Sequence, residues 1–77
     1  MGLMIEIAGQ KYWAVVGNDD RDGMFLEVTD AATTLVAELF YSDRDKSMTF
    51  TAHKSDIPLP LIEWMIDEGR KSLPAAK

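Results

Sequence analysis

Short runs of alternating apolar and polar residues fill most of the chain, and this period of two is typical of half-buried strands. Clusters of Gly, Asp, Asn and Ser, which favour turns, separate the runs. The pattern predicts strands at residues 3–8, 11–16, 24–29, 34–41 and 47–53. The first two are joined by Gly9-Gln10, which fits a two-residue type II′ loop. Because short turns link successive runs, we expect an antiparallel meander of four to five strands.

The same alternation predicts which side chains of each strand share a face. Three strands have a clearly apolar set: Leu3, Ile5 and Ile7; Met24, Leu26 and Val28; and Met48, Phe50 and Ala52. A shift of one residue in the pairing would turn each set toward water. We therefore expect a well-specified register.

A run with helical spacing follows the strands. Its apolar residues recur every three or four positions and form one stripe of a projected helix. We expect a helix over residues 58–72, with Asp56 as its N-cap, Pro58 and Pro60 in its first turn and Pro74 just after its end. The predicted fold class is therefore α+β, an antiparallel meander with one C-terminal amphipathic helix packed on one face, in a single domain of residues 1–77.

Charge and cysteine content narrow the function classes. Thirteen acidic residues against eight basic ones give a net charge of −5, which opposes binding to phosphate backbones and anionic lipids. The chain has no cysteine, which excludes disulfides and thiol chemistry and favours a reducing cytoplasm. It also lacks a signal-peptide pattern and a spanning apolar run, so we expect neither export nor a membrane association.

The second and fourth predicted strands carry more apolar residues than one helix can cover. Trp13 and Val15 alternate with Tyr12 and Val16, so both faces of the second strand are apolar. In the fourth, Val36 and Phe40 alternate with Leu35, Ala37 and Leu39. In the helix, Trp64 projects about 60° outside the apolar stripe and should be at least partly exposed.

Two explanations account for this surplus. Either the sheet curls into a half-barrel that buries both sets, with Trp64 packed on a loop, or the chain forms a homodimer whose shared surface is the uncovered sheet face or the Trp64 edge. We favour the homodimer, because contiguous apolar patches mark interfaces and small cysteine-free domains need additional stabilisation. The candidate interface residues are Trp64, Tyr12, Val16, Val36 and Phe40.

Candidate catalytic and metal-binding residues are few. The loop Asn18–Gly23 partly follows the calcium-loop pattern, but it begins with Asn and has Thr29 where a bidentate Glu is needed. We interpret it as a solvated hairpin loop. His53 is the only histidine and falls on the polar face of its strand, so we expect a surface residue. We expect no enzyme activity, no metal and no cofactor.

Binding of single-stranded nucleic acid is the alternative function. Exposed aromatic side chains on a sheet can stack bases, and the order of four strands followed by a helix resembles that of the single-strand-binding transcription cofactors. Those proteins use a basic sheet face, whereas the net charge here has the opposite sign. Nucleic acid is therefore an unlikely partner, and a small-molecule pocket between sheet and helix stays open as a third function.

Several segments between Asp22 and Pro74 resemble small uncharacterised bacterial proteins, some of them similar to immunity proteins of toxin systems: DGMFLEV, ELFYSD, MTFTAHKSDIPLPLIEW and GRKSLP. The resemblance implies a cytoplasmic, non-enzymatic protein that presents a surface to a partner, for example a basic toxin. We therefore predict a non-catalytic, homodimeric protein-interaction module of immunity or inhibitor type.

Overall fold

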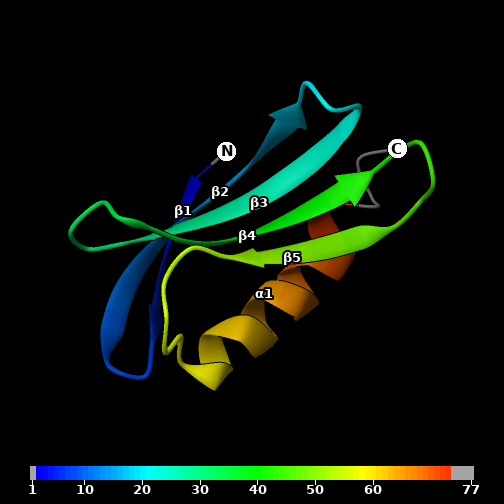
Figure 1. Cartoon of the computed structure of the whole chain (residues 1–77). Helices are drawn as coiled ribbons and strands as arrows, with labels where there is room; N and C mark the ends of the chain where they lie inside the picture. The colour runs from blue at the N-terminus through cyan, green and yellow to red at the C-terminus, as the bar shows by residue number, and fades with distance from the viewer. Residues whose placement is uncertain (1, 74–77) are drawn as a thin grey trace.

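The computed structural model describes residues 2–73 and contains one antiparallel sheet and one helix (Figure 1). The elements are β1 (Gly2–Ile7), β2 (Gln10–Asp19), β3 (Gly23–Asp30), β4 (Leu35–Ser42), β5 (Met48–Ala52) and α1 (Leu59–Ser72). The strands lie in the order β1-β2-β3-β4-β5, so each strand pairs with its neighbour in sequence. The predicted α+β meander with a C-terminal helix is confirmed.

The β1–β2 turn differs from its prediction by one position. Ala8 and Gly9 form the loop, and Ile7 pairs with Gln10 to close it. Both loop residues have positive φ, 53° at Ala8 and 78° at Gly9, which is the type I′ conformation. The predicted Gly9-Gln10 loop is therefore wrong. The faces of β1 are nevertheless as predicted, because the two registers differ by two residues and side chains alternate with the same period.

β2 continues past its predicted end at residue 16, through the polar residues Asn18 and Asp19. These two residues pair with Met24 and Gly23, so backbone hydrogen bonds extend the hairpin where side-chain hydrophobicity does not. Only residues 20–22 turn the chain, and Asp22 has a left-handed φ of 61°.

A β-bulge in β4 corrects the predicted faces of that strand. The register shifts between Val28, which pairs with Ala37, and Thr29, which pairs with Leu35, so Val36 is the extra residue. The side chains of both Val36 and Ala37 are consequently buried. Strict alternation had placed Val36 on the same face as Phe40, and that prediction is wrong.

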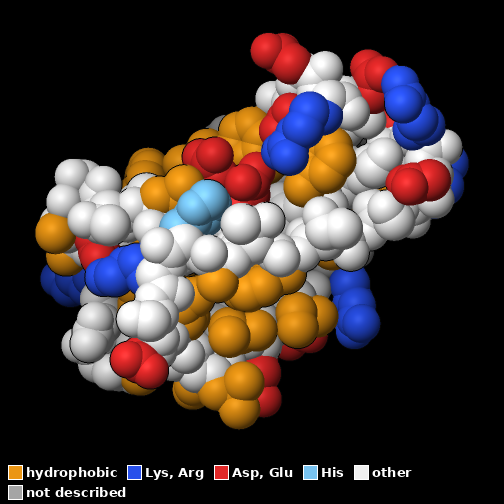
Figure 2. All heavy atoms as spheres, in the orientation of Figure 1, with side chains coloured by type: hydrophobic (Ala, Val, Ile, Leu, Met, Phe, Trp, Pro, Cys, Tyr) orange, Lys and Arg blue, Asp and Glu red, His pale blue; other side chains and the backbone are white. Residues whose placement is uncertain are grey.

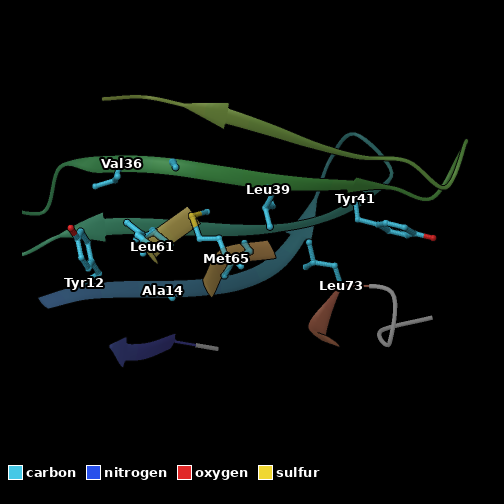
Figure 3. Close-up of a cluster of buried hydrophobic side chains, with 11 residues drawn as sticks. Tyr12, Ala14, Val36, Leu39, Tyr41, Leu61, Met65 and Leu73 are labelled. Atoms are coloured by element: carbon cyan, nitrogen blue, oxygen red, sulfur yellow. The ribbon is translucent and has the colours of Figure 1, made fainter. Parts of the chain in front are cut away.

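α1 packs on the inner face of the sheet, the face that carries Ala14, Leu26 and Leu39. Its buried residues are spaced by four and followed by the buried C-cap: Leu61, Met65, Gly69 and Leu73 (Figure 3). The fully buried side chains of Leu61, Met65 and Leu73 each stabilise the fold by roughly 1.5–3 kcal/mol through removal from water. A Cβ at Gly69 would lie 2.6 Å from Cδ1 of Leu39, so Gly69 lets the helix approach β4 closely.

The helix begins without the predicted side-chain cap. Pro58 is the N-cap residue, and Asp56 lies before it with a left-handed φ of 56°. The carbonyl oxygen of Pro58 accepts hydrogen bonds from the backbone N–H of Leu61 and Ile62, at 3.0 and 3.4 Å. Pro60 has no N–H to satisfy. The helix ends at Ser72, close to the predicted end, while Pro74 lies outside the described residues.

Candidate protein-interaction face

The face of the sheet opposite α1 carries a mixture of aromatic and acidic side chains. We call it the outer face; the strand register places on it Met4, Glu6, Lys11, Trp13, Val15, Phe25, Glu27, Thr29, Glu38, Phe40, Thr49 and Thr51. Within residues 2–73, no helix covers this face, because α1 lies on the other side (Figure 1). Alternation along each strand therefore produces a second, uncovered surface from the same segments that build the core.

Three aromatic rings of the outer face each lie across a glycine of the preceding strand: Trp13 over Gly2, Phe25 over Gly17, and Phe40 over Gly23. A Cβ at Gly17 would lie 2.7 Å from Cζ of Phe25, so the ring occupies the space that a side chain would fill. Because a glycine has no side chain, each ring can lie directly over the neighbouring strand. Part of the apolar surplus is thus accommodated on the outer face within a single chain.

Arg21 reaches from the β2–β3 loop onto this face. Its guanidinium carbon lies 4.0 Å from the centroid of the Phe40 ring, and its Nη2 lies 2.6 Å from Asp19 and 3.1 Å from Glu38. The side-chain hydrogen bond from Arg21, with a second from its backbone N–H, lowers the pKa of Asp19 to about 2. Asp19 in turn raises the pKa of Arg21 above its ordinary value. Arg21 is thus already neutralised by carboxylates of its own chain.

Two glutamates lie side by side at the centre of the outer face. Glu27 of β3 and Glu38 of β4 are direct cross-strand partners. Glu38 has two nearby nitrogen groups: the guanidinium of Arg21, and the imidazole of His53, whose Nε2 lies 3.8 Å from a Glu38 carboxylate oxygen. Among residues 2–73, no cation pairs with Glu27. Figure 2 shows the histidine beside acidic side chains, with hydrophobic side chains close by.

The five predicted interface residues do not lie on one surface of the structure. Tyr12 and Val36 are 4% and 3% exposed, so the prediction that they lie on an uncovered face is wrong. The reason is that Tyr12 lies on the inner face, where it joins the buried cluster, and that the bulge turns Val36 inward. Phe40 lies on the outer face and is half-buried. Val16 and Trp64 are also half-buried and pack against the core.

A groove of about 370 Å³ separates α1 from β1 on the inner face. It is lined mainly by apolar groups and includes Leu3, Ala14, Val16, Leu26 and Trp64. The helix lies close to β4 and β5 at Gly69, which leaves this space over β1 and β2. Trp64 forms a wall of the groove, which explains why a residue outside the helical stripe is half-buried.

Further apolar side chains lie exposed at two places. Leu3 and Met4 of β1 are 51% and 60% exposed, on opposite faces of the strand. Phe50 of β5 and Leu59 and Ile66 of α1 are exposed on the other side of the helix. Figure 2 shows hydrophobic side chains gathered over the region of α1. Sequence reasoning did not single out the β1 pair, although its alternation would place one apolar residue on each face.

The hairpin loop and His53 were the two features considered for metal binding or catalysis. Both carboxylate oxygens of Asp19 accept hydrogen bonds from Arg21, at 2.9 and 2.6 Å, so they are not directed at a shared cation. Within the described part of the chain, no group of three or more His, Cys, Asp or Glu residues is placed to hold a metal ion. His53 lies just beyond β5; its backbone N–H donates to the carbonyl oxygen of Val36 at 2.8 Å, and its imidazole lies beside the partly buried carboxylate of Glu38.

No protein-family model, curated protein or solved structure matches this chain. Between residues 2 and 73, no helix has the length and hydrophobicity needed to cross a membrane.

Proposed function

We propose that this chain is a non-catalytic interaction module whose outer face binds a partner protein carrying basic and apolar side chains. In this proposal the protein is cytoplasmic and bacterial, acts as an inhibitor or immunity-type protein, and forms a homodimer. The Glu27–Glu38 pair carries the proposal. Like charges directly opposite each other on a sheet are destabilising, and a lysine or arginine of a partner would relieve that repulsion.

The surroundings of the pair fit a protein partner. Trp13 is 43% exposed, and Phe25 and Phe40 are half-buried around the carboxylates. Aromatic anchors beside a charged group are the composition that interface hot spots favour. The net charge of −5 would also accelerate association with a basic partner.

Single-stranded nucleic acid is the competing partner of this face. The exposed aromatic rings would suit base stacking, but the glutamates stand where phosphate groups would approach. Arg21, the cation that lies over the Phe40 ring, is bound to Asp19 and Glu38. A protein partner is therefore favoured over a polyanion.

The test compares three forms of the protein: the unmodified chain, Glu27→Lys, and Glu63→Lys as a control that changes the same charge on the exposed side of α1. Each form is used for affinity capture from an extract of the source cells. The recovered protein is then purified and titrated by calorimetry at two salt concentrations. Hydrogen exchange of the complex locates the contact.

The proposal expects a protein that binds the unmodified chain and the Glu63→Lys control, and binds Glu27→Lys at least tenfold more weakly. Higher salt should weaken the binding, and protection should fall on β3 and β4. Equal affinity for Glu27→Lys, or protection confined to α1, would overturn it. So would salt-sensitive binding of a single-stranded oligonucleotide, measured by fluorescence anisotropy.

A further inference from the structure

Among the described residues 2–73, β1 bonds only to β2, so these residues leave the β1 edge of the sheet unpaired. Backbone groups of successive residues in a strand point to alternate edges. The closing pair Ile7↔Gln10 of the two-residue turn is a hydrogen-bonded pair. Counting back from it, every second residue directs its N–H and C=O away from the sheet: Gly2, Met4 and Glu6.

Of the devices that normally prevent edge pairing, β1 has a single charged side chain, Glu6. β1 has the sequence GLMIEI, with no proline, no lysine and no bulge. Leu3 and Met4 expose 51% and 60% of their surface on its two faces. The opposite edge strand, β5, is one residue shorter and is bordered by Lys46 and Lys54. The β1 edge is therefore the better site for strand addition.

We infer that two copies of the chain pair through β1 in antiparallel orientation, with the two-fold axis at Met4, to form one continuous ten-stranded sheet. The inference rests on the proposed homodimer and names its interface. In this register Met4 faces Met4 of the second copy, and Gly2 faces Glu6. The outward-directed groups then form up to about six backbone hydrogen bonds.

The register is self-complementary in charge and in shape. Glu6 lies opposite a glycine, so the two copies bring no like charges face to face. Centring the axis on Glu6 would instead place two carboxylates opposite each other. Leu3 lies beside Ile5 of the second copy on the inner face, which covers its exposed side chain. These matches favour a second copy over an unrelated extended peptide.

Pairing through β1 would also extend the candidate interaction face. Met4 and its cross-strand partner Trp13 lie at the β1 side of the outer face. Across the two-fold axis Met4 meets Met4 of the second copy, and the two Trp13 residues lie one strand further out on either side. The dimer therefore presents one continuous apolar surface flanked by two glutamate pairs. A single copy holds half of this surface.

We expect the β1 dimer to be weak and to become tighter as the salt concentration rises. A six-residue strand pair is small beside a standard interface of about 800 Å² per partner, so we expect a micromolar dissociation constant. Each copy carries a net charge of −5, so the copies repel each other at low salt. Salt should therefore strengthen the dimer, whereas it should weaken binding of a basic partner.

Sedimentation velocity across a concentration series tests the interface with Met4→Pro and Met4→Lys. Proline at position 4 removes an outward N–H that β2 does not use, and lysine brings two charges together at the axis. Ile66→Lys, on the exposed side of α1, is the matched control. We expect both Met4 variants to raise the dissociation constant at least tenfold and the control to leave it within threefold. Circular dichroism reports whether each variant is folded.

Cysteine cross-linking tests the register independently, because the chain contains no cysteine of its own. Met4→Cys should form a covalent dimer in most of the sample under mild oxidation, since the two Cα atoms face each other within disulfide range. Ile66→Cys should stay near the background of random collisions. Loss of the dimer in Met4→Pro could follow from a less stable fold, whereas a cross-link in Met4→Cys could not.

The outcomes separate the interface from the homodimer itself. A chain that stays monomeric at several hundred micromolar in high salt would overturn both. A dimer that persists unchanged in Met4→Pro and Met4→Lys, with no Met4→Cys cross-link, would overturn the β1 interface alone. Loss of the dimer in Met4→Pro and Met4→Lys, together with efficient cross-linking of Met4→Cys, supports the β1 interface.

Discussion

The indole ring of Trp13 lies so closely over Gly2 that a methyl group at position 2 would overlap the ring. We expect Gly2→Ala to displace the indole and to lower the free energy of unfolding by about 1 kcal/mol. Urea denaturation measures the change. In a Trp13→Ala background the same substitution should have almost no effect, because the ring is gone. An equal loss in both backgrounds would mean that the overlap is not its cause.

Gly69 offers a test in which helix propensity and packing have opposite signs. Alanine is better than glycine inside a helix by about 1 kcal/mol. Its methyl group would, however, lie 2.6 Å from Cδ1 of the buried Leu39. We expect Gly69→Ala to destabilise the protein by about 1–2 kcal/mol despite its propensity. Thermal unfolding measures it, and a rise in the melting temperature would contradict close packing of α1 on β4.

The inner and outer sides of α1 should differ sharply in their sensitivity to truncation. Met65 is fully buried, whereas its neighbour Ile66 is 37% exposed. Met65→Ala should lower the free energy of unfolding by about 2–5 kcal/mol, and Ile66→Ala by less than about 1 kcal/mol. Both are measured by urea denaturation. Similar losses at the two positions would mean that α1 is rotated about its own axis, so that Met65 and Ile66 are buried to a similar extent.

Acid should weaken the protein through Asp19. Its pKa in the folded state is about 2, below the ordinary 3.8, so its hydrogen bonds with Arg21 stabilise the fold above pH 3.8 and are lost as the pH falls toward 2. Asp19→Asn should therefore flatten the fall in stability over this range. Lys54 lowers the pKa of Asp30, and Ser47 that of Asp45, so part of the fall should persist. Asp20→Asn is the control in the same loop, and urea midpoints between pH 2 and 5 provide the measurement.

The two tryptophans should report different surroundings. Trp13 is 43% exposed on the outer face, whereas Trp64 packs against the core as a wall of the groove. Trp13→Phe leaves Trp64 as the only indole, and Trp64→Phe leaves Trp13. We expect Trp13→Phe to emit at shorter wavelength than Trp64→Phe and to be quenched less by acrylamide. The reverse order would place Trp64 in solvent and open the groove.

Alternation and helical spacing were sufficient to predict the order of the elements and most of the faces. Leu26, which shares its predicted face with Met24 and Val28, lies in the core as its pattern indicates. Val36 was misplaced, because an extra residue in one strand leaves no mark in hydrophobic periodicity. The end of β2 was misplaced because Asn18 and Asp19 are held by backbone pairing, which residue type does not report.

The candidate site was harder to predict than the fold. Which face of β2 the helix covers depends on where α1 docks, so Tyr12 could not be separated from Trp13 by pattern alone. Glu27 and Glu38 are adjacent only because of the β3–β4 register, and that register includes a bulge. The exposed residues of β1 were visible in the sequence, but their edge position follows from the strand order.

Because every strand pairs with the one made just before it, the sheet can assemble hairpin by hairpin as the chain leaves the ribosome. α1 comes after all five strands, so the apolar inner face stays bare until the helix has been synthesised. During that interval the nascent sheet is exposed to chaperones and to aggregation. Docking of Leu61 and Met65 onto the sheet is then the step that ends this vulnerable period.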